Sequence, residues 1–220
     1  LDVATAEAFH AKFRRKLTQV YGIIECGLPC ADTDESAELI PGCVGKPGKG
    51  YEISIENPDA DDSGVILVRG SGMFDAYFYP FSLSGQVCRD GWFNTGDIGR
   101  MLPDGRLQIT GRSKNVIIFA GMKIFPYEIE NTLRLNPLVK EAVVYGETQE
   151  AGGELPVAEI VLRKEQITDD MTDDYIASEL RRHCYDSLEP QKVPKKFIFV
   201  GEIRKTLSGK ILRHRQNKEE

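Results

Sequence analysis

The sequence predicts a mixed protein of the α+β (α/β) class, and two changes of pattern along the chain support this prediction. Residues 41–69 contain short apolar runs separated by Gly, Pro and Asp, which is typical of a small, turn-rich β region. After Gly111 the patterns follow the order strand, helix, strand, strand, helix, strand, which predicts a compact α+β domain. The 220 residues suffice for one large domain or two small ones.

The elements expected before Gly111 are mainly strands. Apolar residues among charged ones predict a short amphipathic helix over residues 4–15, and residues 16–21 are expected to form a strand that ends at Gly22. The turn residues Pro103-Asp104-Gly105 predict a hairpin. The other strands expected in this half are 51–55, 64–68, 98–102 and 106–109.

The elements expected after Gly111 alternate between strand and helix. Pro126 suits the first position of a helix, so we expect a helix over residues 127–135. Its buried stripe is expected to consist of Ile129, Leu133 and Leu135. A second helix is expected over residues 173–188. The strands expected here are 116–119, 140–145, 157–162 and 196–200.

Composition and charge exclude several classes of protein. Hydrophobic residues make up 41% of the chain and charged residues 28%, which is too apolar for intrinsic disorder. The longest apolar run, residues 116–120, is far shorter than the about 20 residues that span a bilayer, and residues 1–19 lack the apolar core of a secretion signal. The net charge of −6 gives no general attraction to nucleic acid. We therefore expect a cytoplasmic protein, or a piece of a longer one, that binds no nucleic acid.

Cysteine and histidine give no pattern of a metal site. The five cysteines are odd in number and contain no Cys-x-x-Cys pair, so we expect reduced, structural thiols. The three histidines, His10, His183 and His214, are scattered along the chain without the spacing that ligands on one helix or hairpin would have.

Two motifs in the first half place carboxylates where a ligand could reach them. Glu25 ends the stretch Tyr21-Gly22-Ile23-Ile24-Glu25 after an expected strand, although a solvated Glu at a strand end would give the same pattern. Asp97 follows a Gly in Trp92-Phe93-Asn94-Thr95-Gly96-Asp97, where it could accept hydrogen bonds from a sugar diol. The alternative is a buried Trp with a turn-capping Asp.

Two further motifs carry cations. Arg112 and Lys114 follow an expected strand, where a guanidinium could bind phosphate or ribose oxygens. Residues 205–213 place Lys210 directly after Gly209, so that the loop could bring a point charge to a reacting phosphate or carboxylate; a solvated basic segment is the alternative. Residues 45–50 are rich in Gly and Lys but Tyr51 follows them, so they do not match a phosphate loop.

Taken in order, the four motifs resemble the adenylate-forming (AMP-binding) superfamily of acyl-CoA synthetases, aryl-CoA ligases, luciferases and peptide-synthetase adenylation domains. The resemblance covers residues 21–213. It implies a two-step ligase, in which a carboxylate attacks the α-phosphate of Mg-ATP and coenzyme A then captures the acyl-adenylate. Two positions depart from the family pattern, since Ile24 stands where Thr is usual and Arg204 where Pro is common.

The resemblance also implies a role for each matching residue. Tyr21, Asp97 and Arg112 would bind the nucleotide, with Asp97 on the ribose hydroxyls. Lys210 would neutralise the charge that develops between carboxylate and α-phosphate. The remaining roles are Mg²⁺ binding by Glu25, the hinge at Lys114, and the tunnel for coenzyme A at Gly121.

The resemblance finally implies a domain organisation. Residues 1–111 would be the end of the large AMP-binding domain with a small β-barrel-like subdomain, 112–114 the hinge, and 115–220 the mobile C-terminal domain. The chain would then be a C-terminal fragment, inactive alone, of a carboxylate–CoA ligase. Two alternatives remain, an adenylation domain that loads a carrier protein and a non-catalytic nucleotide- or partner-binding module. The first 25 residues are expected to be loosely ordered, or to pair with another chain in a homo-oligomer.

Overall fold

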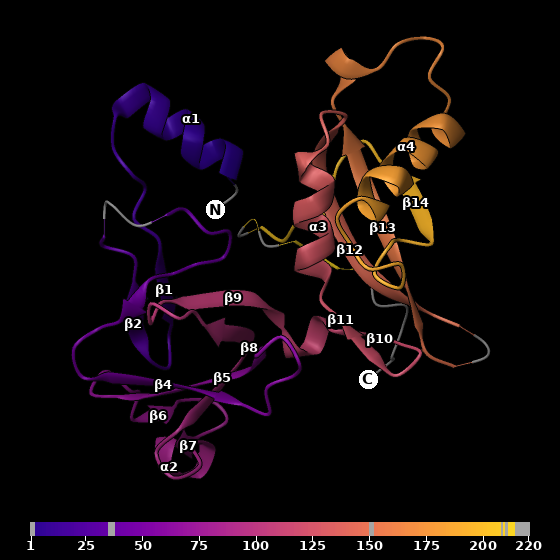
Figure 1. Ribbon diagram of the computed structural model, residues 1–220. Coiled ribbons are helices and arrows are strands. Elements are labelled where there is room, and N and C mark those ends of the chain that lie inside the picture. The colour runs from indigo at the N-terminus through magenta and orange to yellow at the C-terminus, as the bar shows by residue number, and fades with distance from the viewer. Residues whose placement is uncertain (1–2, 35–37, 150–151, 208, 210, 214–220) are drawn as a thin grey trace. The chain divides into compact units, whose positions relative to one another are not determined.

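The computed structural model describes residues 3–34, 38–149, 152–207, 209 and 211–213. The chain divides into two compact units, Leu1–Lys114 and Asn115–Glu220, which we call unit 1 and unit 2 (Figure 1). Both contain antiparallel strands and α-helices, so the predicted mixed α+β class is confirmed. No helix among the described residues is both long enough and apolar enough to cross a membrane.

Unit 1 consists mainly of antiparallel sheets. Its sheets have the strand orders β1-β2-β3, β4-β5-β8-β9 and β6-β7, and its described strands form no closed barrel. The predicted barrel-like subdomain is therefore not confirmed. The elements are α1 (Val3–Phe13), β1 (Val20–Ile23), β2 (Gly27–Ala31), β3 (Lys46–Pro47), β4 (Tyr51–Glu56), β5 (Gly64–Gly70), β6 (Ala76–Tyr77), β7 (Ser82–Leu83), α2 (Ser84–Val87), β8 (Phe93–Met101) and β9 (Leu107–Arg112).

The core of unit 1 lies between the β1 hairpin and the four-stranded sheet. In β5, Ile66 and Val68 are fully buried because alternate side chains of a strand point to the same face. They pack with Tyr21, Cys26 and other buried residues of the β1–β2 hairpin. This packing fixes the end of β1 against the sheet that carries β8 and β9.

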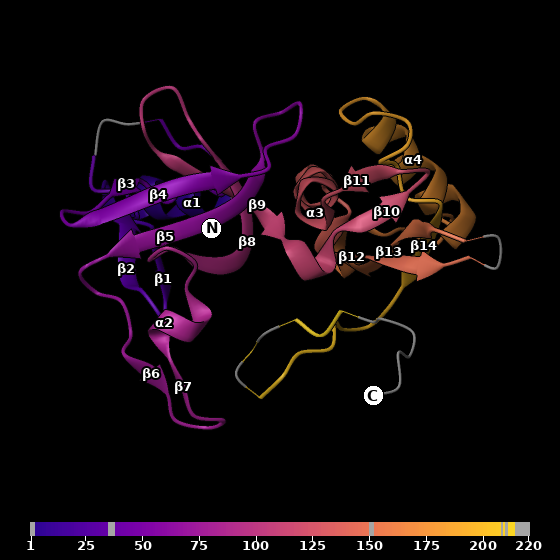
Figure 2. The same ribbon diagram turned by 90° about the horizontal axis from the view of Figure 1, so that it is seen from below.

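Unit 2 is a three-stranded sheet with two helices on one face. The strand order is β12-β13-β14, with β13 and β14 parallel. Figures 1 and 2 both show α3 and α4 on the same side of this sheet. The elements are η1 (Ser113–Asn115) at the unit boundary, β10 (Ile117–Phe119), β11 (Met122–Ile124), α3 (Pro126–Leu135), β12 (Val139–Thr148), β13 (Glu154–Leu162), η2 (Lys164–Gln166), α4 (Asp173–Tyr185) and β14 (Lys196–Phe199).

The two faces of the unit 2 sheet bury different residues. Ala142 and Val144 of β12 face the helices and pack with Leu133 of α3 and Leu180 of α4. The intervening Val143 points to the opposite face, where it packs with Ile203 from the segment after β14. The C-terminal segment therefore covers the face of the sheet that the helices leave open.

Most predicted elements are present, but several differ in their bounds, and the helix expected over residues 4–15 ends at Phe13. The strand expected over residues 16–21 begins only at Val20, because Lys16 lies in the preceding loop with its Nζ 2.8 Å from Asp32 Oδ2. Leu135 is 68% exposed, since a position two residues after Leu133 lies on the other side of a helix. The helix expected over residues 173–188 ends at Tyr185. The elements that the patterns missed are short, or begin directly after a turn: β2, β3, β6, β7, α2, η1, β11 and η2.

The buried thiols make stability sensitive to alkaline pH. All five cysteines are free, and burial raises the pKa of Cys26, Cys30 and Cys184 from 9.0 to about 12. An unfolded thiol ionises above pH 9, while the buried thiol keeps its proton until about pH 12. The contribution of each buried, protonated thiol to the free energy of unfolding is therefore complete below pH 9 and is lost as the pH rises from 9 to 12. We expect the free energy of unfolding to fall by about 1.4 kcal/mol per pH unit for each such thiol.

Urea unfolding between pH 8 and 11 measures this slope. In Cys184→Ala the slope for unit 2 should be smaller than in the unmodified chain, because one titrating thiol is gone. A free energy of unfolding that stays constant from pH 9 to 11 would contradict the assignment.

Candidate active site

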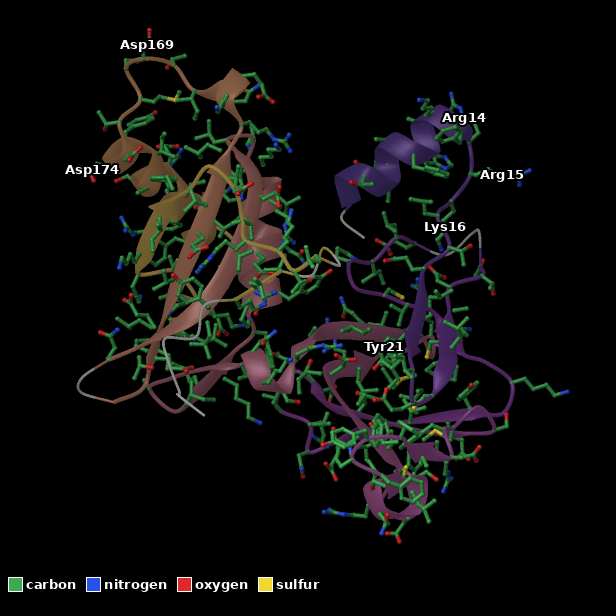
Figure 3. The ribbon with its side chains drawn as sticks, turned by 180° about the vertical axis from the view of Figure 1, so that it is seen from behind. Arg14, Arg15, Lys16, Tyr21, Asp169 and Asp174 are labelled. Atoms are coloured by element: carbon green, nitrogen blue, oxygen red, sulfur yellow. The ribbon has the colours of Figure 1, made fainter. Side chains whose placement is uncertain are left out.

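Three of the residues predicted to bind a nucleotide lie together in unit 1. The antiparallel ladder between β8 and β9 places Asp97 opposite Arg112, and Arg112 Nε lies 2.7 Å from Asp97 Oδ1. From β1, the hydroxyl of Tyr21 donates a hydrogen bond of 2.6 Å to Asp97 Oδ2. Figure 3 labels Tyr21 on its strand. We call Tyr21, Asp97 and Arg112 the Asp97 cluster.

The turn before Asp97 is fixed by its own side chains. Thr95 Oγ1 donates to the carbonyl of Ile66 at 2.8 Å and accepts the amide of Asp97 at 3.1 Å. The amide of Gly96 donates to Asn94 Oδ1 at 2.9 Å, and Gly96 has a φ of 69°, a conformation in which a Cβ would be strained. The Asn-Thr-Gly-Asp sequence therefore fixes the backbone that carries Asp97.

The Asp97 cluster is buried on one side and open on the other. Tyr21 is 6% exposed and Asp97 4%, whereas the side chain of Arg112 is 53% exposed. Burial and the hydrogen bond to Asp97 raise the pKa of Tyr21 far above its ordinary value, so Tyr21 acts only as a neutral donor. A carboxylate has about four lone-pair positions, so Asp97 can accept further hydrogen bonds from a diol.

Glu25 lies in the turn between β1 and β2, separate from the Asp97 cluster in its described contacts. Its Oε1 accepts a hydrogen bond of 2.8 Å from the hydroxyl of Tyr77 in β6, and its carbonyl accepts the amide of Phe74 at 2.8 Å. Burial and the bond to Glu25 raise the pKa of Tyr77 to about 12. The neighbouring Ile24 is 97% exposed at the tip of the turn.

A magnesium site at Glu25 is compatible with this geometry. Residues 3–34, 38–149, 152–207, 209 and 211–213 contain no group of three or more side chains placed to hold a metal ion. Mg²⁺, however, is commonly held by one or two carboxylates together with phosphate oxygens and water. A single half-buried carboxylate whose orientation is fixed by Tyr77 fits that kind of site.

The other predicted site residues lie at the unit boundary and in unit 2. Lys114 is exposed in η1 and is the last residue of unit 1. Gly121 forms the two-residue turn between β10 and β11 together with Ala120, with φ of 80° and 49°. A Cβ on Gly121 would meet no atom within 4 Å. Lys210 lies outside the described residues.

Trp92 does not take part in the Asp97 cluster. It is half-buried, and the guanidinium of Arg69 lies over its ring at 4.5 Å from the centroid. Phe93 is the buried aromatic of this motif, at 7% exposure. The alternative of a buried Trp beside a turn-capping Asp is therefore wrong, because Asp97 is held by Tyr21 and Arg112.

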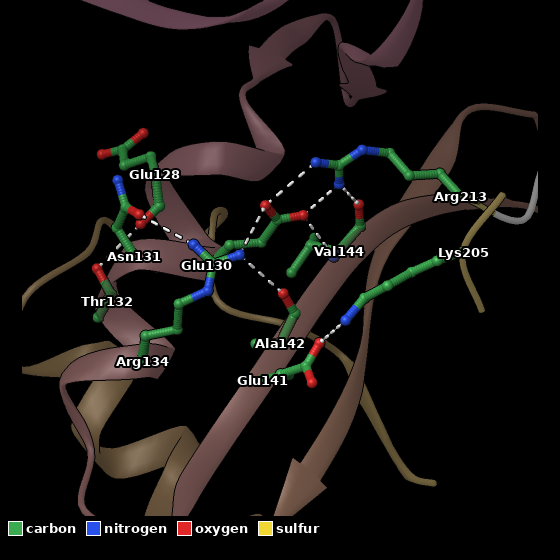
Figure 4. A network of polar contacts seen from close by, with 10 residues as sticks. All are labelled: Glu128, Glu130, Asn131, Thr132, Arg134, Glu141, Ala142, Val144, Lys205 and Arg213. Carbon is green, nitrogen blue, oxygen red and sulfur yellow. Dashed lines mark hydrogen bonds and ion pairs between the residues drawn. The ribbon is translucent and has the colours of Figure 1, made fainter. Parts of the chain in front are cut away.

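A second polar cluster, which the sequence analysis did not predict, lies around Glu130 in unit 2. Glu130 is only 1% exposed and binds Arg134 of the same helix and Arg213 of the C-terminal segment (Figure 4). The one sequence signal was the spacing of Glu130 and Arg134, four residues apart on a helix. That spacing is common on solvated helix faces and does not indicate burial.

Comparisons with known proteins agree with the motif resemblance. Residues 128–210 match the family model of the AMP-binding enzyme C-terminal domain. An indoleacetate–CoA ligase of Aromatoleum aromaticum is 32% identical over 201 residues, which are 89% of this chain and 38% of that protein. A long-chain-fatty-acid–CoA ligase of Haemophilus influenzae is 32% identical over 218 residues, which are 97% of this chain and 37% of that protein.

A solved structure shows the same fold. It is the o-succinylbenzoate CoA synthetase of Bacillus subtilis in complex with its acyl-adenylate intermediate, which matches with a TM-score of 0.81 and 30% identity over 96% of this chain and 43% of that one. The chain thus spans well under half the length of the relatives it matches. The chain belongs to the adenylate-forming superfamily, in which it matches the C-terminal portion of acyl-CoA and aryl-CoA synthetases.

Proposed function

We propose that this chain is the C-terminal part of an ATP-dependent, AMP-forming carboxylate–CoA ligase. In the first step a carboxylate oxygen attacks the α-phosphorus of ATP and pyrophosphate leaves. In the second step the thiol of coenzyme A attacks the acyl carbon and AMP leaves. The Asp97 cluster carries this proposal, because it offers a fixed carboxylate and a half-exposed guanidinium in a chain similar to CoA ligases.

The Asp97 cluster would bind the nucleotide in both steps. Asp97 would accept hydrogen bonds from the ribose hydroxyls, and Tyr21 would hold the carboxylate in place. Arg112 contacts Asp97 through Nε and its side chain is 53% exposed, so the guanidinium would also bind ribose or phosphate oxygens. Glu25 would hold Mg²⁺, which when bound neutralises phosphate charge.

Unit 2 would contribute differently to the two steps. Lys210 would neutralise the charge that develops on carboxylate and α-phosphate in the first step, and Gly121 would line the path of coenzyme A in the second. Residues 1–111 would be the end of the large domain, including its barrel-like subdomain, and Lys114 the hinge for the mobile domain 115–220. One domain would then present Lys210 or Gly121 in turn.

Two measurements test the proposal. The complete protein should catalyse ATP–pyrophosphate exchange that depends on a carboxylic acid, and should then form a CoA thioester. Calorimetry with the 220-residue chain and AMP should show only weak binding, since most of the pocket would be contributed by other residues. Exchange without transfer to coenzyme A would favour a carrier protein as acceptor, and sub-micromolar AMP binding by the chain alone would favour a binding module.

A further inference from the structure

Described residues before and after Lys210 in the sequence are paired with each other in the C-terminal segment. Lys205 and Ile211 form an antiparallel bridge, and the amide of Leu212 donates to the carbonyl of Arg204 at 2.9 Å. The amide of Gly209 donates to the carbonyl of Thr206 at 2.9 Å, which closes the turn. We call the described residues 204–207, 209 and 211–213 the returning segment. Lys210 itself is not among the described residues, but the backbone on both sides of it is.

The beginning of the returning segment is attached to the open face of the unit 2 sheet. Ile203, 5% exposed, packs there with Val143 and Val161. Lys205 Nζ lies 2.6 Å from Oε2 of Glu141 on β12. These contacts hold the part of the chain that leads into the turn.

The end of the returning segment is attached through Glu130. Arg213 Nη2 donates to Glu130 Oε2 at 3.1 Å, and Arg213 Nη1 contacts both Glu130 Oε1 and the carbonyl of Val144, the latter at 3.1 Å. Glu130 Oε1 also accepts the amide of Val144 at 2.9 Å. Arg134 lies on the other side, with Nη2 3.5 Å from Glu130 Oε2 and 3.1 Å from the carbonyl of Ala142 (Figure 4).

The contacts of Glu130 divide into two groups with different effects. Arg134 and the amide of Val144 belong to α3 and β12, so they neutralise and orient the buried carboxylate within the body of unit 2. Arg213 belongs to the returning segment, and its two-pronged contact fixes the geometry of that segment relative to α3. The carboxylate therefore has partners left if Arg213 is removed.

We propose that Glu130 and Arg213 are positioning residues that fix the returning segment, and with it the backbone that carries Lys210, for the adenylation step. This inference rests on the proposed function, because it assigns Lys210 to that step. A positioning role affects chiefly the reaction that needs Lys210, since an error of about 1 Å in placing a catalytic group can cost about 10²-fold in rate. The thioester step, which starts from the finished adenylate, does not depend on it.

The variants Arg213→Gln and Glu130→Gln in the complete protein test the proposal. We expect adenylation, measured as carboxylate-dependent ATP–pyrophosphate exchange, to fall at least about tenfold in both. Thioester formation from supplied acyl-adenylate should stay unchanged. Arg213→Lys keeps the charge but loses the two-pronged contact, so it should recover adenylation in part.

Lys192→Gln is the matched control. Lys192 Nζ lies 3.1 Å from Oε1 of Glu128, so this variant also breaks an ion pair of α3 but leaves the returning segment attached. Its adenylation rate should equal that of the unmodified protein. Amide hydrogen exchange provides the structural readout, because exchange at Gly209 and Leu212 should accelerate in Arg213→Gln while that of Val144 does not.

The outcomes separate this inference from the proposed function. Adenylation by Arg213→Gln at the unmodified rate would overturn the positioning role and leave the proposed function standing. Equal losses in both half-reactions would also overturn it, because they indicate a general loss of structure. Absence of carboxylate-dependent exchange in the unmodified protein would instead overturn the proposed function, and the role of the pair with it.

If Glu130→Gln does not fold, Arg213→Gln alone tests the positioning role, because Glu130 keeps its contacts with Arg134 and the Val144 amide in that variant.

Discussion

Replacement of Lys210 by alanine is expected to slow acyl-adenylate formation by about 10²–10³-fold in the complete protein, as for the loss of one group that stabilises charge in a transition state. The reason is electrostatic, because carboxylate and α-phosphate bring negative charges together during the attack and an ammonium group offsets their repulsion. Capture of the adenylate by coenzyme A involves no such approach. The rate of thioester formation from supplied acyl-adenylate should therefore be preserved.

Separate half-reaction assays measure the effect of Lys210→Ala. Lys140→Ala is a suitable control, because Lys140 is an exposed lysine on β12 with no role in the proposed site. The control should leave both half-reactions unchanged. If Lys210→Ala slowed the two half-reactions equally, the assignment of this lysine to the first step would be wrong.

The second large effect is expected for Asp97→Ala, which should weaken AMP binding by about 1–3 kcal/mol, the range for hydrogen bonds to a charged group. Both half-reactions should suffer, because the nucleotide stays bound through both. The same change removes the acceptor of the buried Tyr21 hydroxyl and the partner of Arg112. We therefore also expect unit 1 to lose about 1–3 kcal/mol of stability from the unsatisfied hydroxyl.

Two other variants separate binding from stability. Tyr21→Phe keeps the ion pair between Asp97 and Arg112, so its loss of AMP affinity should be smaller than that of Asp97→Ala. Asp104→Ala removes another carboxylate of unit 1, which pairs with Arg106 at 2.7 Å and has no role in the proposed site. Calorimetric titration with AMP and urea unfolding give the two quantities for each variant. Unchanged AMP affinity in Asp97→Ala would remove this residue from the nucleotide site.

The β8–β9 hairpin shows how far the sequence alone could predict the Asp97 cluster. The turn at Pro103-Asp104-Gly105 correctly predicts that the two strands pair. Continuing the pairing of Gly99 with Ile109 would place Gly111 opposite Asp97. A register shift between Ile98 and Gly99 brings Arg112 there instead. Such a shift depends on packing around both strands, so no local pattern indicates it.

The Glu130 cluster marks the limit of sequence-based prediction more clearly. The helix over residues 127–135 is confirmed, and Ile129 and Leu133 are buried as predicted. From the sequence, Glu130 would be predicted to be a solvated residue of that helix. Its partner Arg213 is 83 residues away along the chain, so the local pattern does not indicate the contact. Only the path of the returning segment over the sheet brings the two side chains together. Buried charges paired over such distances follow from the tertiary structure.

The end of β9 lies directly before the proposed hinge at Lys114. The ladder extends to the pairing of Asp97 with Arg112, and the hydroxyl of Ser113 still donates to the carbonyl of Gly96 at 3.1 Å. Unit 1 ends one residue later, at Lys114. A hinge at Lys114, as we propose, would lie beyond these contacts, and rotation there would leave the contacts that hold Asp97 within unit 1 in place. Under the proposed function, the nucleotide would therefore stay bound to unit 1 through both half-reactions while the C-terminal domain changes its orientation.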